Sequence, residues 1–285
     1  MGTEKRERQK ANRQLKYEQQ AKQVQRQRLT KRVIVGIVAA VVAVGFVIFL
    51  ALAFGDSDDD SPTPATEVST LSSDSTSGGP LPTVAVPELS GPTTPIEFTY
   101  GTGECPPSEG SAEPVTTFSD APQQCIDPAA TYTARFVTDR GDIVVDLDTT
   151  HSPGTVNNFV TLARFGYYDD TTIFRTNTSI DIIQGGGLTN TDSPGYEIPD
   201  EGTGYEYPPG VLAMARTDAP DSAGGQWFFT TGPNSAGLSG DGTYVVFGAV
   251  TAGSDIAAEI NALAGPDGDT PTESVTLQRV EITES

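Results

Sequence analysis

The pattern of apolar and polar positions predicts a folded domain over residues 129–285. Apolar residues alternate with polar ones at 143–147, which is typical of a strand with one buried face. At 156–163 they recur instead at the spacing of a helix that buries one side. Ser152-Pro153 resembles the start of this helix, with serine as the N-cap and proline at the first helical position. Gly166 then provides a stop signal.

Segments rich in β-branched and aromatic residues, separated by glycine and proline, are predicted as strands. Two of them flank Asp139-Arg140-Gly141, a combination typical of a hairpin turn. A second helix is predicted at 254–263. Many strands with only two helices favour an antiparallel sheet or barrel that the helices cap. The predicted strands are 132–137, 142–147, 211–215, 227–231, 244–250 and 275–282.

A long apolar segment begins at Val33 and ends at Phe54, with no charged residue inside it. A helix of this length reaches about 33 Å, enough to cross a hydrocarbon core of about 30 Å. We therefore predict a transmembrane helix at 33–54. A cleaved secretory signal is the alternative, because Ala51-Leu52-Ala53 resembles a cleavage site, but both the basic region and the apolar core are long for a signal peptide.

Charge divides the chain into two opposite parts around this segment. Of the 17 basic residues, 11 lie in 1–32, and six arginines face 35 acidic residues in the rest. The basic flank predicts a single-pass protein with a cytoplasmic tail at 1–32 and everything after residue 54 outside the cytoplasm. An acidic domain outside the cytoplasm argues against nucleic acid as its partner.

Between the apolar segment and the folded domain lie two further regions. Residues 55–95 are acidic and rich in Ser, Thr and Pro, which predicts a disordered linker. Residues 96–128 contain Cys105 and Cys125, the only cysteines of the chain. Outside the cytoplasm they most simply form one disulfide, with two free thiols as the alternative. No metal site is predicted, since His151 is the only histidine and lies apart in sequence.

Several short motifs follow one another over about 150 residues. They are Thr155 to Ala163, Gly166-Tyr167-Tyr168-Asp169, Ile173-Phe174-Arg175, Gln184-Gly185-Gly186, Gly210 to Ala215, Gly225-Gln226-Trp227-Phe228-Phe229 and Val245-Val246-Phe247-Gly248. Each motif alone is common, but their shared order is specific and resembles that of the cyclophilin family. The resemblance implies a closed antiparallel β-barrel with two helices, and catalysis of cis/trans isomerisation at X-Pro bonds without any cofactor.

The same resemblance implies roles for individual residues. Arg175 would donate a hydrogen bond to the proline nitrogen as that atom becomes pyramidal in the twisted state. Gln184 and Gln226 would orient the arginine and bind substrate backbone. The remaining implied residues form the substrate groove: Phe228, Ile182 and Leu238 line an apolar slot for the proline ring, Ala215 and Arg216 hold the residue before proline through their backbone, and Tyr244 replaces a histidine at the rim.

Some positions depart from the family pattern. One extra residue separates Arg175 from Gln184, and Asp181 stands where the family has a phenylalanine of the slot, although Ile180 could take its place. Arg216 replaces an asparagine, and Gly237 replaces a tryptophan. Two residues are also added between the slot leucine and the Val-Val-Phe-Gly motif. We expect a reshaped slot and isomerase activity that these substitutions reduce.

The sequence thus predicts a membrane-anchored prolyl isomerase that acts on proline-containing polypeptides and assists the folding of secreted or surface proteins. A non-catalytic module that uses the same groove to hold proline-containing segments, as a chaperone or adaptor, is the alternative. A tethered scaffold, whose basic tail recruits partners, is a third hypothesis.

Overall fold

A computed structural model of the chain describes residues 86–240 and 242–285. The predicted tail, the predicted membrane helix and the linker up to residue 85 lie outside the described residues. Among the residues that are described, no helix is both long enough and apolar enough to cross a membrane.

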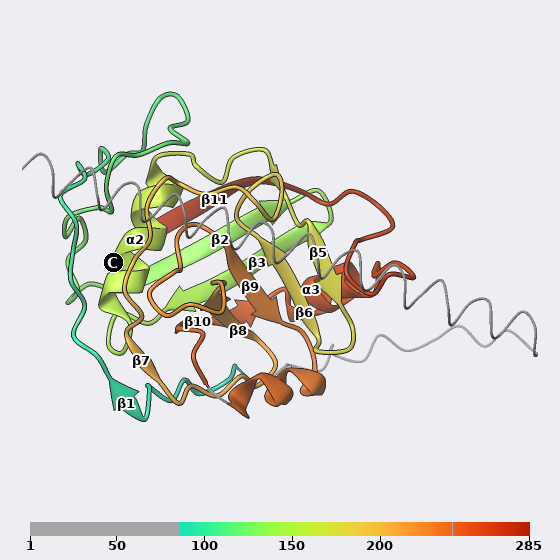
Figure 1. Ribbon diagram of the computed structural model, residues 1–285. Helices are drawn as coiled ribbons and strands as arrows, with labels where there is room; N and C mark the ends of the chain where they lie inside the picture. The colour runs from blue at the N-terminus through green and yellow to red at the C-terminus, as the bar shows by residue number, and fades with distance from the viewer. Residues whose placement is uncertain (1–85, 241) are drawn as a thin grey trace, which may run out of the picture. The chain divides into compact units, whose positions relative to one another are not determined.

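The domain is built on one curled sheet of nine strands, in the order β4-β11-β2-β3-β10-β8-β9-β6-β5 (Figure 1). All neighbours in it are antiparallel. This confirms the expectation of a mainly β domain with an antiparallel sheet. The strands are β2 (Tyr132–Thr138), β3 (Gly141–Leu147), β4 (Thr171–Thr172), β5 (Arg175–Asn177), β6 (Ile182–Gly185), β8 (Val211–Met214), β9 (Trp227–Thr230), β10 (Val246–Ala252) and β11 (Thr276–Glu284).

The two outer strands of the sheet are neighbours in the sequence. β4 pairs with β11 at one edge, while β5 pairs with β6 at the other. Thr172 of β4 also forms an isolated bridge with Gly187, just beyond β6. This single bridge brings the chain just beyond β6 next to β4, at the opposite edge of the sheet. The strand pairing thus shows a curled sheet with two edges, where the sequence predicted a closed barrel.

Two α-helices lie at opposite ends of the curled sheet: α2 (Pro153–Arg164) and α3 (Ser254–Asn261) (Figure 1). Both lie where the apolar spacing predicts them. A third helix, the 3-10 helix η1 (Pro233–Gly240), corrects the expectation of two. Its sequence is rich in Ser and Gly and buries only Ser235, so no apolar periodicity marks it.

The main core lies between the sheet and α2 and is rich in aromatic side chains. The Phe136 ring centroid is 5.0 Å from those of Trp227 and Phe229, and 5.6 Å from that of Phe159 on α2. All four side chains are at most 1% exposed. Burial of this size stabilises by about 2 kcal/mol or more per side chain, so this cluster holds the helix on the sheet.

The N-terminus of α2 is capped by a residue that sequence reasoning missed. Ser152 occupies the N-cap position, but its hydroxyl donates to the carbonyl of Val246 at 2.7 Å instead. The carboxylate of Glu201, 3% exposed, accepts from the N–H groups of Gly154 and Thr155 at 2.8 and 2.7 Å. Burial raises the pKa of this carboxyl, while the hydrogen bonds from the helix oppose that shift.

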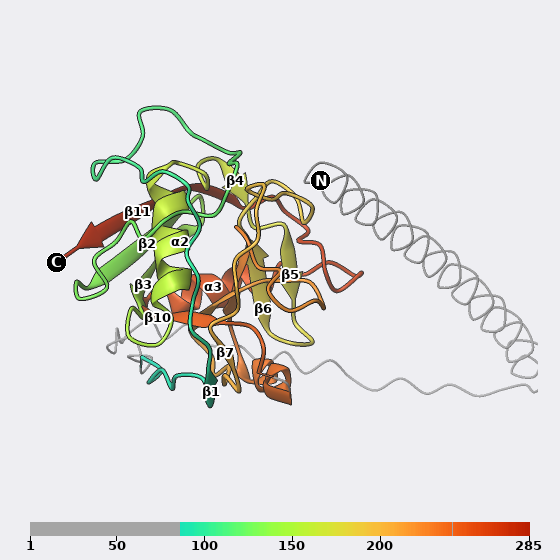
Figure 2. The same ribbon diagram turned by 60° about the vertical axis from the view of Figure 1, so that its left-hand side comes forward.

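The segment before β2 packs against the domain and runs along α2 (Figure 2). β1 (Thr94–Pro95) pairs with β7 (Gly202–Thr203) in a separate two-stranded sheet. The ring of Phe98 lies directly against Gly154, where a side chain would collide with it. Cys105 and Cys125 are joined in a disulfide, as predicted.

Replacement of Glu201 by alanine is expected to destabilise the domain. The change removes a buried cap and leaves two helix N–H groups without an acceptor, so the free energy of unfolding should fall by about 2–3 kcal/mol. Chemical denaturation followed by circular dichroism measures this loss.

Glu259→Ala is the matched control, because Glu259 is exposed on α3. It should change the free energy of unfolding by less than about 0.5 kcal/mol. Equal losses in the two variants would show that Glu201 does not act as a cap.

Candidate active site

Strand pairing brings the predicted catalytic residues together. Arg175 on β5 stands opposite Gln184 on β6, and Gln184 stands opposite Phe228 on β9. Gln226 directly precedes β9. Because paired residues of neighbouring strands point to the same face, three of these side chains share one face of the sheet.

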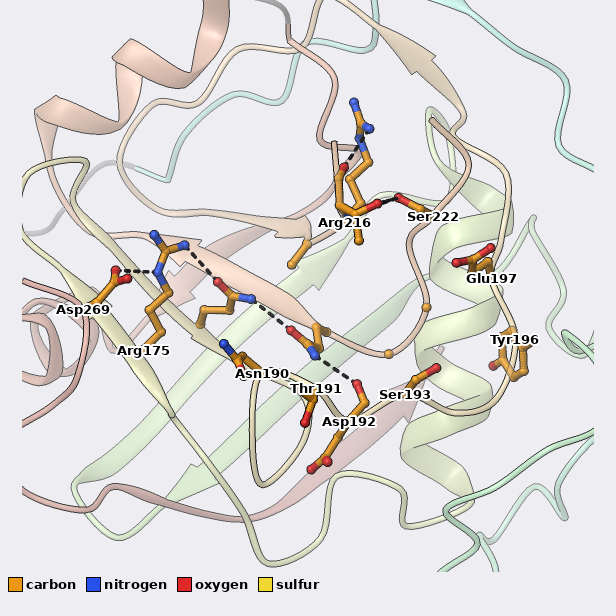
Figure 3. A pocket seen from close by; sticks show the side chains of 16 residues that line it. Arg175, Asn190, Thr191, Asp192, Ser193, Tyr196, Glu197, Arg216, Ser222 and Asp269 are labelled. Atoms are coloured by element: carbon orange, nitrogen blue, oxygen red, sulfur yellow. Dashed lines mark hydrogen bonds and ion pairs between the residues drawn. The ribbon is translucent and has the colours of Figure 1, made fainter. Parts of the chain in front are cut away.

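A directed chain of hydrogen bonds links the polar side chains (Figure 3). Arg175 Nη1 donates to Gln184 Oε1 at 3.2 Å, and Gln184 Nε2 donates to Gln226 Oε1 at 3.0 Å. Gln226 Nε2 then donates to the backbone carbonyl of Asp192 at 2.9 Å. Each amide uses its oxygen toward Arg175 and its nitrogen away from it, so both orientations are set by their neighbours.

Asp269 holds the other side of the guanidinium. Its carboxylate accepts from Arg175 Nε at 2.8 Å and from Asn177 Nδ2 at 3.0 Å. Asp269 is exposed. In the same turn, the carboxylate of Asp267 accepts hydrogen bonds from backbone N–H groups, and these donors lower its pKa to about 2. Sequence reasoning missed Asp269, since only the Asp-Gly-Asp turn marks it and Arg175 is 94 residues away.

A cavity of about 460 Å³ opens beside this chain. Asp192 and Glu197 also line it (Figure 3). Because the charge of Arg175 is paired with that of Asp269, the remaining charged side chains of the lining are more acidic than basic. The lining comprises Arg175, Gln184, Asn190, Thr191, Asp192, Ser193, Tyr196, Glu197, Ala215, Arg216, Thr217, Ser222, Gly224, Gly225, Gln226 and Asp269.

The predicted slot residues gather in an apolar cluster of their own. Phe228 and Ile182 are each 3% exposed, and the ring of Tyr244 meets that of Phe228 edge-on with centroids 5.4 Å apart. Leu238 from η1 and Ile180 are partly buried and pack against the cluster. These residues therefore lie in one cluster, and their role as a slot for the proline ring stays a prediction.

Asp181 does not face this cluster. It has a positive φ of 46°, and its carboxylate accepts from the backbone N–H of Asn234 at 2.8 Å. Its carbonyl accepts from Thr231 N–H at 2.8 Å. The residue that replaces the family's phenylalanine thus caps the start of η1.

Arg216 contributes its side chain as well as its backbone. Its guanidinium donates to the carbonyls of Thr243 at 3.0 Å, Thr217 at 3.1 Å and Ala219 at 2.7 Å. It also lies 5.7 Å from the ring centroid of Tyr244, in reach of a cation–π contact. The side chain is only 8% exposed, so it joins two loops beside the slot, a role that sequence reasoning did not assign.

Two neighbours of Arg216 were also missed. The Tyr207 hydroxyl donates to the carbonyl of Tyr244 at 2.9 Å and accepts from its N–H at 2.8 Å. Burial raises the pKa of Tyr207 well above its usual range, so the hydroxyl keeps its proton and can donate. Burial also raises the pKa of Asp200, which lies 3.8 Å from Arg216. Neither residue belongs to a motif that the sequence makes visible.

The backbone of Ala215 is already used inside the protein. Its N–H donates to the carbonyl of Gln226 at 2.9 Å, so only its carbonyl and methyl group can meet a ligand. Within 86–240 and 242–285, no group of three or more His, Cys, Asp or Glu side chains is arranged to hold a metal ion.

Comparison with known proteins gives consistent matches to one family. Its sequence profile, described as "Cyclophilin type peptidyl-prolyl cis-trans isomerase/CLD", matches residues 133–282. Peptidyl-prolyl cis-trans isomerase B of Escherichia coli is 34% identical over 166 residues, which cover 52% of this chain and 98% of that protein. Peptidyl-prolyl cis-trans isomerase-like 1 of Gibberella zeae is 34% identical over 154 residues, covering 52% and 92%.

A longer relative shares only this domain. Peptidyl-prolyl cis-trans isomerase-like 2 of Rhizopus delemar is 34% identical over 156 residues, but these cover only 28% of its length. The profile spans more than half of the present chain and includes Arg175, both glutamines and the apolar cluster. The chain therefore belongs to the cyclophilin-type peptidyl-prolyl cis-trans isomerase family.

Proposed function

We propose that Arg175 and its neighbours catalyse cis/trans isomerisation of X-Pro bonds in polypeptides. The observation that carries the proposal is the hydrogen-bond chain from Arg175 through Gln184 and Gln226, which lies beside an open cavity and a separate apolar cluster. A fixed donor next to an apolar surface is what the reaction requires.

The reaction is slow because the C–N bond before proline has partial double-bond character. In the twisted state the proline nitrogen becomes pyramidal and gains a lone pair. A guanidinium N–H can donate to that lone pair but gains nothing from the planar ground state, so the contact lowers the barrier selectively. No nucleophile, metal or proton transfer is needed.

The arrangement around Arg175 supports this role. Asp269 holds Nε and Gln184 holds Nη1, so the plane of the guanidinium is oriented before substrate arrives. Little reorganisation is then required in the twisted state. The proline ring would meet the cluster at its partly exposed side, where Leu238 and Tyr244 line a second cavity, because Phe228 and Ile182 behind them are each only 3% exposed.

The proposal extends to where the domain works. A membrane anchor at 33–54 with a cytoplasmic tail is supported by the apolar run and the distribution of charge. The disulfide supports an oxidising compartment outside the cytoplasm. In this setting the substrates are secreted or surface polypeptides, and the role is assistance in their folding.

One observation favours the non-catalytic alternative. Asp269 offsets part of the positive charge of Arg175 on the side that faces the cavity. A guanidinium held in this way stabilises a developing lone pair less strongly, although it still binds a carbonyl oxygen. A module that only holds proline-containing segments would retain the groove and lose the rate enhancement.

Arg175→Ala in the full-length chain is expected to lower kcat/KM for an X-Pro peptide by about 100-fold or more, because it removes the donor to the proline nitrogen. Exchange spectroscopy by NMR on a labelled peptide measures the rate directly. Arg279→Ala is the control, since Arg279 is exposed on β11 and pairs with Glu281. Wild-type chain that binds the peptide without accelerating its exchange would establish the non-catalytic module instead.

Gln184→Ala is expected to lower kcat/KM by about tenfold, a smaller loss than that of Arg175→Ala, because the arginine remains but one of its two holding contacts is lost. The double variant should be no slower than Arg175→Ala alone, since Gln184 acts through the arginine. The same exchange measurement applies. Losses that simply multiply would show that the two residues act independently.

A further inference from the structure

The loop between the two cysteines lies outside the family match yet contacts the active-site region. The family profile begins at residue 133, so residues 105–125, here called the disulfide loop, are an addition of this chain. The loop runs from Asn157, in the middle of α2, to the C-terminal end of that helix and returns. Its contacts show what this addition does.

Both ends of the disulfide loop are fixed. The Cys105–Cys125 bond joins them, and next to it Gly103 forms a bridge with Pro122. Asn157 of α2, which is fully buried, accepts from the N–H of Cys125 at 2.6 Å and from that of Ile126 at 3.2 Å. The base of the loop is therefore tied to α2.

The middle of the disulfide loop follows the C-terminal end of α2. Ser111 N–H donates to the carbonyl of Arg164 at 2.8 Å, and Val115 N–H donates to that of Phe165 at 2.9 Å. Most side chains between 106 and 117 are exposed. Such a loop buries too little apolar surface to offset its own chain entropy, so the covalent closure has to limit its conformations.

Phe118 is the point at which the disulfide loop reaches the cavity wall. Its N–H donates to the carbonyl of Pro194 at 2.8 Å, and its ring centroid is 6.1 Å from that of Tyr196 and 5.2 Å from that of Phe165. Gly195 has a positive φ of 100°, and a Cβ there would lie 2.7 Å from the carbonyl oxygen of Phe118. This close approach requires glycine.

The contacted residues belong to the wall of the cavity. Ser193, Tyr196 and Glu197 line it (Figure 3), and residues 193–197 are called the wall segment below. The Tyr196 hydroxyl donates to Asn158 Oδ1 at 2.7 Å, and Asn158 Nδ2 donates to the carbonyl of Gly224 at 2.8 Å. Gly224 lines the same cavity and lies against the wall segment, since a Cβ there would be 3.1 Å from the carbonyl oxygen of Tyr196, so the position of Tyr196 affects that of Gly224 as well.

We propose that the disulfide loop braces the substrate cavity, with Phe118 as the positioning residue for the wall segment. The brace sets the affinity for polypeptides that extend beyond the X-Pro pair, and leaves the contact between Arg175 and Gln184 untouched. This inference rests on the proposed isomerase function. Opening the bond with a dithiol reductant gives two thiols and converts the reductant into its own disulfide, which removes the closure of the loop.

The test compares two substrates on the full-length chain by NMR exchange spectroscopy. One is N-acetyl-Ala-Pro-methylamide, which has no side chain beyond the X-Pro pair, and the other is a ten-residue peptide with the same Ala-Pro bond. For Phe118→Ala and for Cys105→Ser/Cys125→Ser, KM for the longer peptide should rise about tenfold, equivalent to about 1.4 kcal/mol, with kcat unchanged within about twofold. The kcat/KM for the short substrate should stay within about twofold.

Two variants provide the controls. Phe118→Tyr keeps the aromatic ring and should restore the KM of the wild type. Val115→Ala lies in the same loop, and its side chain is 36% exposed, so it should leave both substrates unaffected. Equal losses for the two substrates, or no loss for either, would contradict the brace and leave the disulfide loop with a role in stability alone.

Failure of the function and failure of the brace give different results. If the wild-type chain accelerates neither substrate, the isomerase proposal fails. The Kd of the longer peptide then tests the brace. Weaker binding of this peptide by Phe118→Ala than by the wild type supports the brace, and equal binding overturns it. If Phe118→Ala does not fold by near-UV circular dichroism, reduced wild-type chain takes its place in the comparison. Loss of the native spectrum on reduction would also overturn the proposal.

Discussion

The register of β5, β6 and β9 is the constraint on which the site depends. Arg175, Gln184 and Phe228 stand in one row across these strands, while Thr176, Ile183 and Phe229, one residue further on or back, point into the core. Because strand side chains alternate, a slip of one residue would turn the side chains of Arg175 and Gln184 into the core and those of Ile183 and Phe229 out of it. The packing of Ile183, Trp227 and Phe229 therefore also holds the arginine and glutamine in place.

Elements with a local signal could be predicted from the sequence, and contacts between distant segments could not. The apolar spacing located α2 and α3, and alternation located β2 and β3. The serine before α2 looked like its cap, but the carboxylate of Glu201 accepts from the helix N–H groups, and no local pattern reveals it because Glu201 lies 46 residues beyond Thr155. The helix η1 has no apolar periodicity and was missed for that reason.

The same distinction applies to the site. Motif order along the chain pointed to Arg175, both glutamines and the apolar cluster, and the strand register places Arg175, Gln184 and Phe228 side by side. Asp269, Tyr207 and the side-chain role of Arg216 depend on loops that meet only in three dimensions. Two of the departures from the family pattern are also connected in space, since Arg216 lies over Tyr244. This contact beside the apolar cluster is not revealed by single positions read in sequence.

Trp227 is the only tryptophan of the chain and is completely buried. Its neighbour in β9, Phe228, points to the opposite face, into the cluster proposed to receive the proline ring. The strand thus carries an intrinsic fluorophore on its inner face and a ligand contact on its outer face, one residue apart. Emission from this indole, the only one in the chain, reports on the interior of the domain and offers an optical readout of how far an event at the groove is felt in the core.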